Sequence, residues 1–113
     1  MPASKEEVMA SLAKMTSKMD NPKYQSRFAD FNKTLQFKFK DMEESNCHIV
    51  FQGGTASIQD GIAENPDLGI TTTTDTIMGI MAGKISPTRA FMGGKIKAKG
   101  PMNDLLKLQA LMK

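Results

Sequence analysis

Alternation of apolar and polar residues in TLQFKFK, residues 34–40, limits the fold more than any other feature of the chain. Because successive side chains of a strand point to opposite faces, this spacing predicts a half-buried strand. One face carries the apolar residues Leu35, Phe37 and Phe39, and the other carries Gln36, Lys38 and Lys40. We therefore expect a sheet with helices covering one face and a second face that is solvent-exposed and rich in lysine.

The rest of the chain predicts four further strands and five helices. Short β-prone stretches predict strands at 47–52, 55–60, 68–73 and 95–99. Apolar spacing of three and four residues predicts helices at 4–20, 22–31, 76–84, 87–92 and 102–112. We expect Thr74 or Asp75 to cap the third helix. This order predicts an α+β fold, with a five-stranded, mostly antiparallel sheet and about five helices over one face.

Length and charge favour one small domain over residues 1–113. Solubility alone explains the net charge of +3, which does not require nucleic acid as a partner. The single cysteine, Cys47, cannot form an internal disulfide and fits a reducing compartment. The first residues lack the apolar core of a signal peptide, and no apolar run reaches the roughly 20 residues of a membrane span. We therefore expect a cytoplasmic protein.

The residues that could carry catalysis do not form a site. Cys47 and His48 are the one cysteine and the one histidine, and neighbours on a strand point to opposite faces. One cysteine and one histidine are also too few for a conventional structural zinc site, which takes four such ligands. No carboxylate pair stands out, because Glu43 and Glu44 lie in a polar turn. We expect no catalytic residues, no metal and no cofactor.

Lysines near the glycines at 93–94 suggest two other kinds of site. A phosphate loop needs Gly, four residues and then Gly-Lys-Ser/Thr, and the residues around Lys84 and Lys95 do not fit that pattern. Binding of single-stranded nucleic acid needs aromatic side chains beside the charge, and here the aromatics alternate onto the opposite face. We therefore expect a turn before a strand with outward lysines, and no nucleic acid.

Apolar residues dominate the segments to which none of these chemical sites was assigned. The segments 75–92 and 102–112 are rich in Ile, Met, Phe and Leu, and the chain has ten methionines, which suit adaptable apolar pockets. Composition alone leaves two alternatives open, a well-packed core and a ligand cavity.

The string TTTTDTIMGIMAGKISPTRAFMGGKIKAKGPMNDLLKLQALMK, residues 71–113, closely resembles the C-terminal half of the sterol carrier protein type 2 family of non-specific lipid-transfer domains. The first half matches more loosely, in the order and length of its elements. The resemblance implies a hydrophobic tunnel between sheet and helices that binds fatty acids, fatty acyl-CoA, phospholipids or sterols. By position it places eight residues in the tunnel lining: Ile77, Met78, Met81, Phe91, Met92, Leu105, Leu108 and Met112. The ending ALMK differs from the peroxisomal address of some members, which again favours the cytoplasm.

Three positive residues, Lys84, Arg89 and Lys95, are candidates for contact with a ligand headgroup or transiently with a membrane surface. Solvated side chains without a role are the alternative. We expect a monomer or weak dimer that binds and transfers lipid without catalysis. A stationary accessory module for a lipid- or quinone-modifying enzyme is one alternative, and a nucleic-acid-binding or scaffold protein is another.

Overall fold

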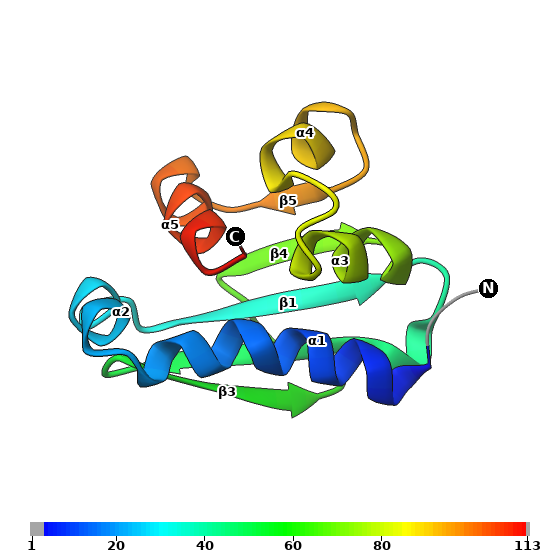
Figure 1. The fold of residues 1–113 in the computed structure, drawn as a ribbon. Helices are drawn as coiled ribbons and strands as arrows, with labels where there is room; N and C mark the ends of the chain where they lie inside the picture. Colours follow the sequence, from blue (N-terminus) through cyan, green and yellow to red (C-terminus); the bar gives the residue numbers. More distant parts are fainter. Residues whose placement is uncertain (1–3, 113) are drawn as a thin grey trace.

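A five-stranded sheet forms the framework of the computed structural model, which describes residues 4–112 (Figure 1). The strand order is β3-β2-β1-β4-β5. The strands are β1 (Lys33–Phe39), β2 (Cys47–Gln52), β3 (Thr55–Asp60), β4 (Leu68–Thr72) and β5 (Lys97–Lys99). β1 pairs in parallel with β4, and the other three pairs are antiparallel. The α+β fold with a mostly antiparallel sheet is confirmed, and the sheet is mixed because of the β1–β4 pair.

Within residues 4–112, five α-helices and two short 3-10 helices accompany the sheet. The helices are α1 (Lys5–Ser17), α2 (Pro22–Arg27), α3 (Thr74–Met81), α4 (Pro87–Met92) and α5 (Met102–Met112). The 3-10 helices are η1 (Lys18–Asp20) and η2 (Glu43–Ser45). In Figure 1, α1 lies along β1 and β3, whereas α3, α4 and α5 gather towards β4 and β5.

The apolar face predicted for the sheet forms the core. Leu35, Phe37, Phe39, Ile49 and Phe51 are each at most 2% exposed, and one face of α1 packs against the same core cluster. Because Phe37, Phe39 and Phe51 are covered, they cannot stack on nucleobases as a single-strand-binding sheet requires.

The prediction that Gln36 faces water is wrong, since this side chain is 2% exposed. β3 and β4 point the same way, so residues 61–67 must travel back along the sheet, and they do so over its open face. The Gln36 amide binds this connection, accepting a hydrogen bond from Ala63 N at 2.6 Å and donating to Cys47 O at 2.9 Å. A buried amide with both ends bonded is stable there. Lys38 and Lys40 on the same face are exposed, as predicted.

Several element ends also differ from expectation. α1 ends at Ser17 and the 3-10 helix η1 continues to Asp20, and α3 spans Thr74–Met81 instead of 76–84. Thr73, not Thr74 or Asp75, caps α3, since its hydroxyl accepts from Thr76 N. α2 ends at Arg27, and irregular turns carry the chain through Phe31. β5 begins at Lys97, because the amides of Lys95 and Ile96 both donate to Ala90 O and extend the turn after α4.

Candidate ligand-binding cavity

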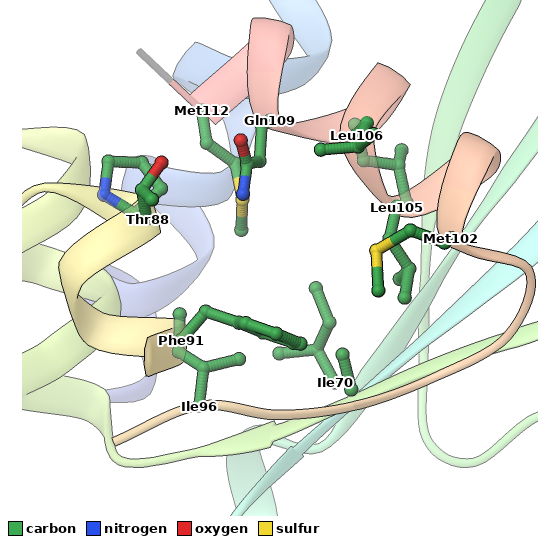
Figure 2. A pocket seen from close by; sticks show the side chains of 12 residues that line it. Ile70, Thr88, Phe91, Ile96, Met102, Leu105, Leu106, Gln109 and Met112 are labelled. Atoms are coloured by element: carbon green, nitrogen blue, oxygen red, sulfur yellow. The ribbon is translucent and has the colours of Figure 1, made fainter. Parts of the chain in front are cut away.

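An apolar cavity of about 290 Å³ lies between α4, α5 and the β4–β5 edge of the sheet (Figure 2). Twelve residues line it: Met102, Leu105, Leu106, Leu108, Gln109 and Met112 from α5, Pro87, Thr88 and Phe91 from α4, and Ile70, Ile96 and Ala98 from the sheet side. None of the twelve is charged, so the cavity suits an uncharged apolar group.

Local sequence patterns determine which residues of α4, α5 and the sheet face the cavity. Residues 102, 105, 109 and 112 of α5 recur at spacings of three and four, which puts them on one face of the helix. α4 begins with Pro87 in its first turn, after Ser86, whose hydroxyl caps the helix by accepting from Arg89 N. Ile70 and Ala98 are register partners on β4 and β5, so they form adjacent parts of the cavity floor.

Exposed apolar side chains surround the mouth of the cavity. Phe91 is 38% exposed, Met102 57% and Leu106 55%. Figure 2 shows these side chains and that of Met112 around one open space. Apolar surface that remains accessible beside an apolar hollow is a feature of ligand-binding and membrane-contact sites.

α5 is fastened to the rest of the molecule outside the cavity. Asp104 forms an ion pair with Lys33 of β1, and both side chains are partly buried. Lys107 Nζ lies 5.5 Å from the centre of the Phe28 ring, a cation–π contact. Three residues of α5, Leu108, Leu111 and Met112, are buried, whereas α4 buries only Ala90.

The structure brings together four of the eight residues predicted to line a tunnel. Phe91, Leu105, Leu108 and Met112 border the cavity. The other four lie elsewhere: Ile77 in the core, Met78 beside Ser11 of α1, Met81 half-buried against the core, and Met92 on the surface, 81% exposed. α3 packs mainly on α1 rather than beside α5, which separates its residues from this cavity. Lipid contact by any of the eight remains a prediction.

Sequence reasoning missed most of the floor and rim. The α5 spacing contained a signal for Met102, Leu106 and Gln109, which share the face of Leu105. Ile96 and Ala98 alternate with the lysines that were expected to point outward, and Ile96 is buried, but no local pattern indicates a cavity above them.

A second hollow, of about 650 Å³, adjoins the first. Its lining contains all three positive residues singled out in the sequence, Lys84, Arg89 and Lys95. Pro87 and Met112 line both hollows.

The chemically reactive side chains lie away from these hollows. Burial, helped by the Asp60 carboxylate, raises the pKa of the Cys47 thiol to about 12, which keeps it protonated and unreactive. His48 Nδ1 lies 3.0 Å from Gly61 O, to which it donates. Within residues 4–112, no three His, Cys, Asp or Glu side chains are grouped to hold a metal ion. Over the same residues, no helix is both long enough and apolar enough to cross a bilayer.

Comparison with known proteins identifies the family. The model of the SCP-2 sterol transfer family matches residues 12–113. Hydroxysteroid dehydrogenase-like protein 2 of Homo sapiens is 42% identical over 50 residues, which are 44% of this chain and only 12% of that protein. The sterol carrier protein domain 2 of Helicoverpa armigera has a TM-score of 0.75 at 20% identity, covering 99% of this chain and 91% of that one.

UbiJ-SCP2, a ubiquinone synthesis protein, has a TM-score of 0.66 at 13% identity, covering 92% of this chain and 93% of that one. At such identities the two solved structures show a shared fold alone. The family match extends over most of the sequence. The chain therefore belongs to the SCP-2 sterol transfer family.

Proposed function

We propose that this protein binds and transfers lipids without catalysis, taking fatty acids, fatty acyl-CoA, phospholipids or sterols into the cavity between α4 and α5. One observation carries the proposal: the cavity is lined by twelve residues without a charge among them, and its rim exposes Phe91, Met102 and Leu106.

The hydrophobic free energies favour exchange of lipid between protein and membrane over permanent retention by the protein. Moving each methylene from water into an apolar site is worth roughly 0.8 kcal/mol, and leaving a bilayer costs about the same. The two contributions nearly cancel, so lipid can pass between protein and membrane. The methionine side chains at 102 and 112 can adapt to ligands of different shape.

The size of the cavity implies that a wall moves when a long ligand enters. At about 290 Å³ it lies just below the range of roughly 300–1,000 Å³ usual for small-molecule pockets. α4 is the easier wall to displace, because it buries only Ala90 whereas α5 buries three residues and is held by the Lys33–Asp104 pair. We propose that the segment 83–94, which carries α4, opens as the lid.

A charge at the rim tests the assignment. Phe91→Asp places a carboxylate at the cavity, whereas Met92→Asp places the same group on the neighbouring residue, which is 81% exposed and lines no wall. Packing an apolar chain against an unpaired charge has a large free-energy cost. We therefore expect Phe91→Asp to weaken fatty-acid binding by at least about tenfold. The second change should leave binding and vesicle-to-vesicle transfer near wild type. Equal binding by both variants would contradict the proposal.

A stationary accessory module is the second candidate. Two findings favour it: the match to hydroxysteroid dehydrogenase-like protein 2 occupies 12% of a longer protein, and UbiJ-SCP2, named for ubiquinone synthesis, shares the fold. In that case the protein would present a lipid to an enzyme rather than carry it between membranes. Lipid binding without any vesicle-to-vesicle transfer would favour this candidate over the first.

A further inference from the structure

Three positive side chains from separate segments converge on the hollow of about 650 Å³ that adjoins the apolar cavity. Lys84 follows α3, Arg89 lies on α4, and Lys95 follows α4. All three are exposed. Among the residues the structure describes, none of them forms an ion pair or hydrogen bond through its side chain.

The two lysines are placed by the same backbone motif. Two residues beyond the last residue of each of α3 and α4 lies a glycine with left-handed φ, Gly83 at 76° and Gly94 at 79°, and a lysine follows each. The amide of Lys84 donates to Gly79 O and that of Lys95 to Ala90 O, which are the bonds of a Schellman turn. These backbone bonds satisfy the last carbonyls of both helices, so the ammonium groups are not needed as caps.

The part of the sequence that surrounds the hollow also lacks acidic residues that could balance its positive charge. Residues 76–103 contain five lysines and arginines and no aspartate or glutamate. A concave surface lined by one sign of charge attracts ligands of the opposite sign.

The positive hollow and the apolar cavity share part of their walls. Pro87 and Met112 border both, and Figure 2 shows Met112 pointing from the end of α5 into the apolar cavity. A molecule with an apolar chain and an anionic head therefore finds both of its parts matched across this boundary.

We infer that Lys84, Arg89 and Lys95 form an anion subsite for the head of the ligand, and that the ligand class is a single-chain amphiphile with a carboxylate or phosphate head. The chain lies along α5 and β5, and the head lies between the ends of α3 and α4. This inference rests on the proposed lipid-binding function. It gives the bound lipid an orientation, and it favours anionic lipids over sterols, whose hydroxyl is uncharged.

Matched ligands and charge-matched variants test the subsite. Decyl phosphate and decanol share the chain and differ in the head. Lys84→Gln, Arg89→Gln and Lys95→Gln together remove the subsite, whereas Lys38→Gln, Lys97→Gln and Lys99→Gln remove equal charge from the open sheet face, where those lysines line a different groove. All six side chains are exposed, so both triple variants should fold, which circular dichroism checks.

We expect the subsite variant to lose affinity for the phosphate head of the ligand and not for its chain. An exposed ion pair contributes a factor of about 1.5 to 5 to an equilibrium constant, so wild type should bind decyl phosphate about tenfold more tightly than decanol at low salt. The subsite variant should lose that advantage and keep its affinity for decanol. The sheet-face variant should keep both affinities within about twofold, since its changes lie outside the hollow.

Other outcomes would overturn the inference in distinguishable ways. If wild type binds decanol but gains nothing from the phosphate, or if both triple variants lose the gain equally, the subsite fails and the cavity stands. If inorganic phosphate alone binds wild type as tightly as decyl phosphate does, the hollow binds free anions and not lipid heads. If neither decanol nor decyl phosphate binds, the proposed function itself fails.

Discussion

Pro87, the first residue of α4, and Met112, the last residue of α5, border both the apolar cavity and the positive hollow beside it. The two hollows therefore adjoin where the first residue of α4 and the last residue of α5 form part of both walls. A ligand that spans this boundary touches α4, which we propose as the lid, and α5, which the Lys33–Asp104 ion pair holds. Lid motion, chain binding and head recognition can consequently be tested by separate substitutions.

Gly94→Ala tests the lid. Gly94 has φ 79° and a Cβ added there meets nothing within 4 Å, so alanine introduces backbone strain without a clash. Such strain costs about 1 kcal/mol, and if opening relieves it, lipid exchange should accelerate about fivefold. Stopped-flow release of a fluorescent fatty acid measures the rate.

Gly53→Ala is the control for that experiment. Gly53 has φ 58° and is equally unobstructed, but it lies in the β2–β3 turn away from the cavity. It should lower the free energy of unfolding by a similar amount and leave exchange unchanged. Equal acceleration by both variants would mean that general loosening, not the segment 83–94, controls release.

Asp41→Asn tests how the start of α3 is held. Asp41 accepts hydrogen bonds from Thr74 N at 3.0 Å and Thr74 Oγ1 at 2.6 Å. Partial desolvation is the largest single influence and raises the pKa of Asp41, but hydrogen bonds from the Thr74 hydroxyl, the Thr74 amide and the Asp41 amide together outweigh it and hold that pKa below its ordinary value of 3.8. The variant cannot accept both bonds, so it should lower the free energy of unfolding by about 1 kcal/mol at neutral pH.

The pH dependence of this effect has a fixed sign. A carboxyl with a depressed folded pKa stabilises the protein above its unfolded pKa, and the contribution is lost as pH falls through the folded value. The stability difference between wild type and Asp41→Asn should therefore shrink below pH 3.8. Asp75→Asn, in the first turn of the same helix, is the control and should change stability by less than about 0.5 kcal/mol. Chemical denaturation across pH provides the measurement, and a difference that grows on acidification would refute the assignment.

Cys47 should resist thiol reagents in the native protein. Its pKa of about 12 leaves almost no thiolate at pH 8, and its side chain is buried. We expect no reaction with Ellman's reagent over minutes, and complete reaction in denaturant. Rapid labelling of the folded protein would show that β2 opens or that the thiol is more acidic than its surroundings imply.

The fold could be predicted from the sequence because its strongest patterns are local. Leu35, Phe37 and Phe39 alternate along one strand, and the helices carry caps and prolines at their starts, so each element was visible on its own. The burial of Gln36 was not visible, because it depends on where residues 61–67 cross the sheet. That path is set by the parallel β1–β4 pair, a long-range feature without a local signal.

The cavity, like the fold, combines features that the sequence indicates locally with features that depend on long-range packing. Four of the eight residues expected to line a tunnel, Phe91, Leu105, Leu108 and Met112, border it, and their contact with lipid stays a prediction. Ile77, Met78 and Met81 of α3 were placed with them by their positions in the same string, residues 71–113. The spacing of a helix predicts which face is buried but not which neighbour buries it, and here α1 is the main neighbour of α3.

Methionine methyl groups offer the most direct test of the cavity as the lipid site. Met102 and Met112 line it, whereas Met15 of α1 and Met19 of η1 belong to the core. In protein labelled with methyl-¹³C methionine, with signals assigned by single substitutions, addition of decanol should shift the resonances of Met102 and Met112 and leave Met15 and Met19 unchanged. Shifts at Met78 and Met81 with Met102 and Met112 unmoved would contradict the account and place the ligand beside α3.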